Sequence, residues 1–108
     1  MKLLTKKQSP SIPKEFQLFG KTIKVVFDQE RCDADGSYGL ALYAESKVLL
    51  SKRFDGKDID PVKIETTFWH EVVHYILNDL RYKKLSEDEV FVSRFAMVLH
   101  QVLSSAKI

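Results

Sequence analysis

The chain has 108 residues, of which 44% are hydrophobic and 30% are charged, and its formal net charge is +2. This length allows one folded domain with a modest core and excludes a second one. The positive excess is small and scattered, which argues against a nucleic-acid partner. No apolar run approaches the roughly 20 residues of a membrane span, so no membrane partner is expected.

The N-terminus and the cysteine usage predict a cytoplasmic protein. Cys32 is the only cysteine, so the chain cannot form an intramolecular disulfide. The opening stretch MKLLTKKQSP is interrupted by lysines and lacks the apolar run of a signal peptide. Pro10 and Pro13 lie in a stretch rich in Lys, Ser and Thr, which predicts a flexible N-terminal arm over residues 1–13 and a single domain over residues 14–108.

Residues 14–52 are expected to form a sheet. Apolar side chains alternate along EFQLFGKTIKVVF with a break at Gly20, a pattern that predicts a β-hairpin. The polar residues 28–37 contain Asp35-Gly36 and are predicted to form a loop with a turn. YGLALY and KVLLSK then predict two more short strands. The expected result is a small, mostly antiparallel twisted sheet.

Two helices are expected to follow the sheet. After a second predicted loop, RFDGKDID, the pair Asp60-Pro61 supplies an N-cap and a first helical residue for a helix over residues 61–79. Ser86 and Glu89 have the spacing of a capping box, which predicts a second helix over residues 87–104. The second helix has apolar residues enough to be buried on more than one side. The predicted fold class is α+β, with the sheet packed on these two helices.

The stretch TFWHEVVHYIL contains candidate metal ligands and a candidate general base. His70 and His74 lie about 40° apart and one turn from each other on a helix, so both rings could bind one zinc ion. Glu71 projects about 100° away, where it could take a proton from a water held by the metal. This arrangement predicts a zinc-dependent metalloendopeptidase with Glu71 as the general base. The alternative is a helix whose histidines are ordinary surface or core residues.

A hydrolytic zinc site needs a third protein ligand, and the acidic run SEDEV offers three carboxylates. Glu89 is favoured over Glu87 and Asp88, because Val92 and Ala96 would turn its face toward the first helix. The alternative is that each of these acids is solvated and simply stabilises the first turn of the helix.

HEVVH followed by EVFVSRFA resembles the small single-domain gluzincin metallopeptidases, which include the minigluzincins and the ImmA/IrrE family. The resemblance implies a zincin-like fold in a bacterial or phage-encoded protein. It also implies one Zn²⁺ ion bound by His70, His74 and Glu89, with Glu71 as base.

The chain departs from the family pattern four residues after the glutamate ligand. The family often has Asp or Asn there, and this chain has Ser93, whose hydroxyl could still accept a hydrogen bond from a ligand histidine. Asp88 is a second candidate for such a supporting role.

The resemblance further implies that an edge strand beside the active-site helix binds an extended peptide or unfolded protein substrate. The residues of this strand would be Gly39, Leu40, Ala41, Leu42 and Tyr43. The alternative is an ordinary hairpin strand. Tyr75 and Tyr82 are candidates for stabilising the oxyanion, and the N-terminal arm could inhibit the protein by covering its cleft.

A second function stays open alongside the peptidase. A chain this small has room only for a shallow cleft, and such a cleft can serve as an interaction site. The alternative function is therefore a non-catalytic or latent zinc-binding module with a regulatory role.

Overall fold

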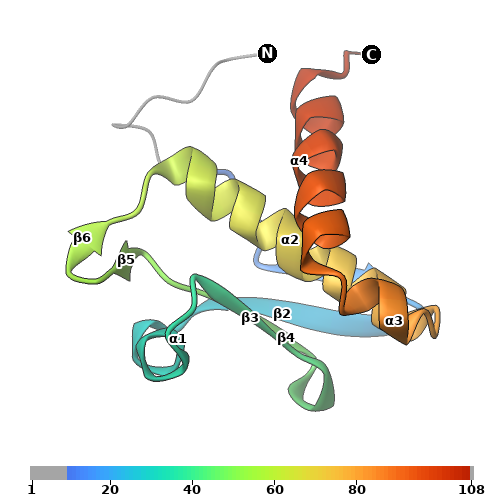
Figure 1. The fold of residues 1–108 in the computed structure, drawn as a ribbon, viewed down its shortest axis with the longest axis horizontal. Coiled ribbons are helices and arrows are strands. Elements are labelled where there is room, and N and C mark those ends of the chain that lie inside the picture. Colours follow the sequence, from blue (N-terminus) through green and yellow to red (C-terminus); the bar gives the residue numbers. More distant parts are fainter. Residues whose placement is uncertain (1–9, 108) are drawn as a thin grey trace.

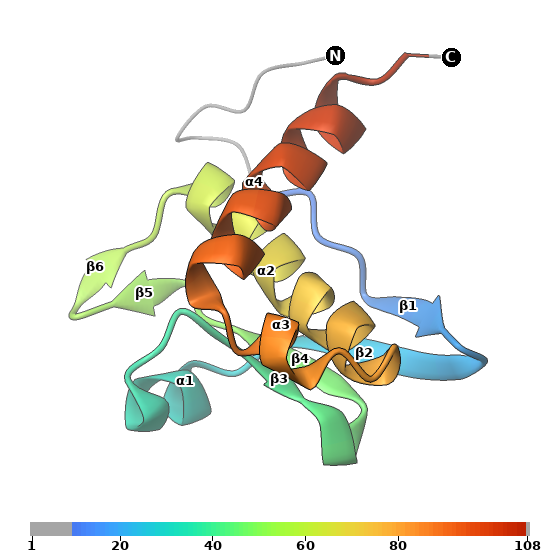
Figure 2. The same cartoon turned by 45° about the vertical axis from the view of Figure 1, so that its right-hand side comes forward.

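The computed structural model describes residues 10–107, which form three stacked layers (Figure 1). A four-stranded sheet lies at one side, helix α2 (Pro61–Asp79) covers one face of it, and helix α4 (Glu89–Ser105) packs on α2. The α+β class is confirmed. The two helices do not share the sheet as expected, because α2 occupies its covered face and α4 packs chiefly on α2 (Figure 2).

The sheet is mixed, with strand order β1-β2-β4-β3. The strands are β1 (Glu15–Leu18), β2 (Lys21–Phe27), β3 (Gly39–Leu42) and β4 (Lys47–Leu50). β1 pairs antiparallel with β2, and β3 pairs antiparallel with β4, as the two predicted hairpins require. β2 and β4 are parallel, however, so the sheet is not purely antiparallel. Parallel pairing needs a crossover connection, and residues 28–38 and β3 supply it.

Part of this crossover is helix α1 (Gln29–Asp35), where the sequence predicted a loop. The Asp28 carboxylate accepts a hydrogen bond from the Arg31 backbone N–H and caps the helix. Gly36, at φ 73°, ends it in the left-handed conformation, so Asp35-Gly36 closes a helix instead of forming a turn. The prediction was wrong because Cys32 is the only buried residue of α1, which leaves no apolar stripe to detect.

The second predicted loop is also ordered. β5 (Arg53–Phe54) and β6 (Lys57–Asp58) form a two-stranded hairpin. Asp55 and Gly56 close it with φ values of 52° and 78°, which suit the tight hairpin turn that Asp-Gly favours. The start of α2 agrees with its prediction, since Asp60 accepts from the Val62 backbone N–H at 2.9 Å and Pro61 is the first helical residue.

Two apolar clusters hold the layers together. The cluster between the sheet and α2 contains Ile23, Val48, Leu50, Ile64, Phe68, Val72 and Tyr75. The cluster between α2 and α4 contains Val73, Leu77, Val92 and Ala96. Because residues of α2 belong to both clusters, this helix is the central element of the fold.

The predicted capping box of the last helix is wrong. Asp88 caps α4 by accepting a hydrogen bond from the Phe91 backbone N–H at 3.0 Å. Ser86 instead ends a separate short helix, α3 (Lys83–Ser86), in which its side chain is buried. Aspartate is also a preferred N-cap residue, so the sequence offers Asp88 as a second start, although Phe91 three residues later cannot complete a capping box.

The outer face of α4 is less buried than expected. Within this helix only Val92 and Ala96 are buried, whereas Val98 and Val102 are 57% and 55% exposed. The expectation of burial on several sides is wrong because α4 has one main packing partner, α2. Its opposite side therefore presents apolar residues to solvent.

Residues 10–13 of the predicted arm have no regular secondary structure. The Ser11 backbone N–H donates a hydrogen bond of 2.7 Å to the Glu65 carboxylate, and Ile12 packs against the core. Residues 1–9 lie outside the described residues, so the inhibitory role of the arm stays a prediction. Within residues 10–107, no helix has both the length and the apolar character needed to cross a bilayer.

Candidate metal centre

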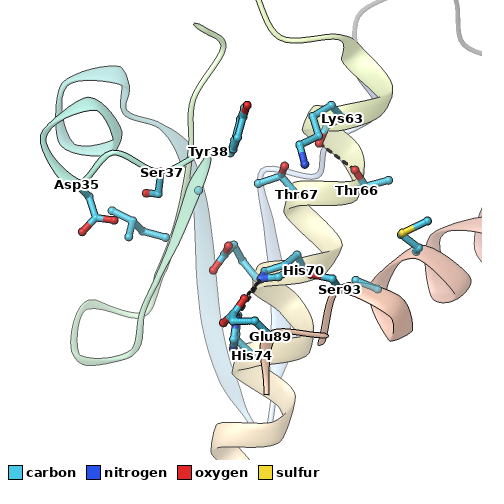
Figure 3. Close-up of a pocket in the computed structure, with 15 residues that line it drawn as sticks. Asp35, Ser37, Tyr38, Lys63, Thr66, Thr67, His70, His74, Glu89 and Ser93 are labelled. Carbon is cyan, nitrogen blue, oxygen red and sulfur yellow. Dashed lines mark hydrogen bonds and ion pairs between the residues drawn. The ribbon is translucent and has the colours of Figure 1, made fainter. Parts of the chain in front are cut away.

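The three residues predicted to bind metal converge at one point between α2 and α4 (Figure 3). The His70 and His74 Nε2 atoms lie 3.2 Å apart, and each is 3.0 Å from one oxygen of the Glu89 carboxylate. Ligands bound at about 2.0–2.1 Å in a tetrahedral site are separated by about 3.3 Å. The spacing of these atoms therefore fits one small metal ion, and the group could hold it.

The packing of α4 on α2 brings these side chains together. Val92 and Ala96 pack against Val73 and Leu77, which sets the first turn of α4 over the middle of α2. Glu89 lies three and seven residues before Val92 and Ala96, so it projects toward the histidines from the same side of α4. The sequence favoured Glu89 over Glu87 and Asp88 because it predicted this orientation.

Two serine hydroxyls contact the other nitrogens of the histidine rings. Ser86 Oγ lies 3.1 Å from His74 Nδ1, and Ser93 Oγ lies 3.4 Å from His70 Nδ1. If each Nδ1 donates its proton to a serine, both Nε2 atoms present lone pairs to each other and to the carboxylate. Such a group of acceptors is stabilised by a cation at its centre.

The Ser93 contact is the one predicted from the sequence, and Ser86 was missed. Its spacing from Glu89 matched a helix cap, and no periodic pattern in the sequence places it beside His74. Asp88 has a different contact from the predicted supporting one, since its carboxylate caps α4.

Glu71 is nine-tenths buried and lines the same cleft as the ligands. Burial, reinforced by the negative charges of Glu89 and Asp35, raises the pKa of Glu71 to about 8. Burial and the neighbouring His74 lower the pKa of His70. Neutral imidazole is the form that binds metal, and a divalent cation nearby would favour the ionised form of Glu71.

A cleft of about 460 Å³ opens above these residues between β3, α2 and α4. β3 is the edge strand of the sheet, so its outer edge has no partner strand among the described residues. Gly39 packs closely on α2, because a Cβ atom at this position would lie 2.9 Å from the Thr67 methyl group and 3.0 Å from the Leu49 carbonyl oxygen. The predicted edge strand thus lies beside α2, which carries His70 and His74.

The predicted substrate-binding strand is one residue too long. β3 ends at Leu42, and Tyr43 begins the 3₁₀ helix η1 (Tyr43–Glu45). Gly39 and Leu40 line the cleft, whereas Ala41, Leu42 and Tyr43 are not among its lining residues.

Neither tyrosine proposed for the oxyanion lines the cleft. Tyr75 is fully buried, and its hydroxyl donates to the carbonyl oxygens of Leu42 at 2.6 Å and Lys47 at 3.1 Å. Tyr82 is 60% exposed and precedes α3. Tyr75 was a wrong choice because its side chain faces the sheet, where it joins the ends of β3 and β4.

The far end of the cleft contains residues that the sequence reasoning did not select. Tyr38, Lys63 and Thr66 line it, at the end nearest the start of α2 (Figure 3). Lys63 is seven residues before His70 and so lies on the same helical face. The seven-residue spacing between Lys63 and His70 could have identified Lys63 from the sequence as a residue of the same cleft.

No family model, curated protein or solved structure matches this chain. The chemistry of the site must therefore be argued from its own geometry.

Proposed function

We propose that this protein is a zinc-dependent metalloendopeptidase of zincin type. The observation that carries the proposal is the convergence of His70, His74 and Glu89 beside a buried Glu71, at the base of a cleft bordered by a strand edge. A chance pair of surface histidines would not require a carboxylate from a second helix at 3.0 Å from both rings.

Zinc at this site would lower the pKa of a bound water to about 7 and polarise a substrate carbonyl. Glu71 takes the proton from the attacking water and then gives it to the amine of the departing chain. Glu71 lines the cleft beside the candidate ligands, and a divalent cation held there would favour its ionised form, which is the form that accepts a proton. Ser86 and Ser93 keep the histidine rings oriented through their Nδ1 atoms.

The free edge of β3 suits a peptide in extended conformation. Backbone hydrogen bonds along a strand edge bind such a peptide with little dependence on its side chains. The Glu89 side chain is 64% exposed, so the metal position is open to solvent and substrate on that side. We expect flexible or unfolded protein segments as substrates.

Two substitutions test this function. Glu71→Gln should keep stoichiometric zinc, measured by elemental mass spectrometry, while reducing the cleavage of casein by more than about 100-fold. Glu89→Ala should lose both zinc and cleavage, because it removes a ligand. Glu87→Ala, which changes a neighbouring acid outside the cleft, is the matched control and should alter neither. Full cleavage by Glu71→Gln would overturn the role of this residue.

One observation favours the second candidate, a zinc-binding interaction module. The outer face of α4 is apolar and exposed, as expected of a surface that meets a partner. This function predicts tight zinc binding without cleavage of casein or peptides. It also predicts that Glu71→Gln leaves the biological activity intact, whereas His74→Ala abolishes it.

A further inference from the structure

Lys63 stands apart from the other charged residues of the cleft. The acidic, basic and histidine side chains lining the cleft are Asp35, Lys63, His70, Glu71, His74 and Glu89. Of these, Lys63 is the only lysine or arginine. Three of the others converge on the metal position, and Glu71 lies beside it. A fixed positive charge therefore occupies the far end of the cleft.

The ammonium group of Lys63 is held in place without a carboxylate partner. Its Nζ atom lies 4.8 Å from the centre of the Tyr38 ring, a cation–π contact that orients the side chain across the mouth of the cleft (Figure 3). No carboxylate of residues 10–107 lies within 4.0 Å of it; the four ion pairs formed by lysines and arginines there involve Lys21, Lys24, Arg31 and Arg53. The charge remains available to a ligand.

The distance from Lys63 to the metal position matches a short stretch of extended peptide. Seven residues of helix separate Lys63 from His70, which corresponds to about 10.5 Å along the axis. An extended peptide rises about 3.3 Å per residue, so this distance spans about three residues. A peptide lying along β3 would pass Gly39 and Tyr38 as it reaches Lys63, because both also line the cleft.

We propose that Lys63 binds a carboxylate of the substrate about three residues from the cleaved bond. This inference rests on the proposed peptidase function and adds a substrate preference to it. The backbone of β3 binds any extended chain, and Lys63 selects chains that carry a negative charge at the right distance. Asp35 lies on the β3 side of the cleft, where it disfavours a second acidic residue.

The test uses fluorogenic peptides of one flexible sequence in which Glu, Gln or Lys replaces a single residue. The substituted position is moved from four residues before the cleaved bond to four after it. We expect kcat/KM to be about fivefold higher for Glu than for Gln at the position three residues away, since an ion pair open to solvent contributes up to about 1 kcal/mol. High salt should reduce this preference.

Three variants separate recognition from general effects. Lys63→Met should abolish the preference for Glu, and Lys63→Glu should reverse it in favour of Lys. Lys52→Met is the matched control, because Lys52 Nζ lies 4.8 Å from the centre of the Phe27 ring but lies outside the cleft. A preference for Glu that survives in Lys63→Met, or no preference in the parent protein, would overturn the inference.

The carboxylate could belong to an acidic side chain or to the C-terminus of the substrate. Peptides that end about three residues beyond the cleaved bond, as a free acid or as an amide, distinguish these sources. Faster cleavage of the free acid, lost in Lys63→Met, assigns Lys63 to the C-terminal carboxylate. Faster cleavage only with internal Glu assigns it to a side chain.

Binding measurements separate this inference from the peptidase proposal. The same peptides are titrated into zinc-loaded Glu71→Gln and followed by fluorescence anisotropy. Tighter binding of the Glu peptide that depends on Lys63, with no cleavage by the parent protein, supports Lys63 as a binding site for peptide carboxylates and rejects the peptidase and the placement relative to a cleaved bond. Cleavage without any charge preference supports the peptidase and rejects the role of Lys63.

Discussion

At the scale of single residues, two hydroxyl groups contact the histidines of the candidate metal centre. Ser86 is buried and lies 3.1 Å from His74 Nδ1, a shorter contact than the 3.4 Å between Ser93 and His70. We expect Ser86→Ala to weaken zinc binding by about 10-fold or more, because the ring loses the group that fixes its orientation and tautomer. Competition with a chromophoric chelator measures this affinity.

The shorter contact, between Ser86 and His74, should contribute more to zinc affinity than the contact between Ser93 and His70. Ser93→Ala is expected to weaken zinc binding less than Ser86→Ala, whereas Ser86→Thr should retain most of the affinity because it keeps a hydroxyl group. Ser104→Ala, at the far end of α4, serves as a control for the loss of a serine. Equal affinities of Ser86→Ala and the parent protein would rule out this role for Ser86.

Cys32 is fully buried, and burial raises the pKa of its thiol to about 11, well above the usual range of a cysteine. The folded protein therefore keeps this proton at pH values where the unfolded chain has released it. The resulting stabilisation is complete below about pH 9 and is lost as the pH rises toward 11. A shift of this size corresponds to roughly 1–3 kcal/mol.

Two measurements check the behaviour of Cys32. Urea unfolding between pH 8.5 and 11 should show a steeper loss of stability in the parent protein than in Cys32→Ser. Iodoacetamide at pH 8 should modify the native protein far more slowly than the unfolded chain. Rapid modification of the native thiol would contradict the burial seen here.

At the scale of elements, the position of β3 against α2 depends on Gly39. An added Cβ would lie 2.9 Å from the Thr67 methyl group and 3.0 Å from a backbone oxygen of β4. Gly39→Ala should therefore lower the free energy of unfolding by about 1–3 kcal/mol and displace the strand edge from the cleft. Adding Thr67→Ser removes the closest contact and should restore part of the loss. Urea unfolding of Gly39→Ala and of Gly39→Ala/Thr67→Ser measures the loss of stability and its partial recovery.

Tyr75 connects α2 to the ends of β3 and β4 by its two hydrogen bonds to Leu42 and Lys47. Tyr75→Phe should reduce the free energy of unfolding by about 1–2 kcal/mol, because buried carbonyl oxygens lose their donor. Zinc affinity should stay unchanged, and kcat should fall by less than about threefold. A large fall in kcat with unchanged stability would instead indicate that the hydroxyl acts on the substrate.

The elements that the sequence predicted well are those specified by local patterns. α2 begins at a capping aspartate and a proline, the β1–β2 hairpin follows period-two alternation, and β3 and β4 are short apolar runs on either side of a polar connection. The parallel pairing of β2 with β4 could not be predicted, because it depends on which way the chain crosses after β2. α1 and the β5–β6 hairpin were missed because each has too few apolar residues to show a period.

Within the site, too, the residues placed by a local pattern could be predicted, and those placed by the packing of separate elements could not. His70, Glu71 and His74 are positioned by one helix, so their spacing in the sequence gives their geometry. Glu89 could be selected only because apolar neighbours indicated the packed side of α4. Ser86 belongs to α3 and Tyr38 precedes β3, and their places depend on how these elements meet α2.

At the scale of the whole molecule, the order of the layers creates the cleft. α2 packs with the sheet on one side and α4 on another, so the surface of α2 between them stays open. The ligands and Lys63 lie on this open surface, with the edge of β3 along one side and α4 along the other. The apolar outer face of α4 follows from the same arrangement, since no further layer covers it.

A largely buried contact between Glu65 and His100 joins the N-terminal segment, α2 and α4 away from the candidate metal ligands. His100 Nε2 lies 2.9 Å from one oxygen of Glu65, and the other oxygen accepts the Ser11 backbone N–H at 2.7 Å. The Glu65 and His100 side chains are only 8% and 16% exposed. Removing the imidazole takes away one of the two hydrogen-bond partners of the largely buried Glu65 carboxylate.

We therefore expect His100→Leu to lower the free energy of unfolding by roughly 1–3 kcal/mol. The double variant Glu65→Leu/His100→Leu should recover much of this loss, because it removes the stranded carboxylate, although the Ser11 N–H then lacks its acceptor. Glu45→Gln, which breaks the exposed pair with Arg31, should have a much smaller effect. Urea unfolding of the zinc-loaded protein measures all three. A double variant less stable than His100→Leu alone would mean that Glu65 stabilises the fold through Ser11 more than through His100.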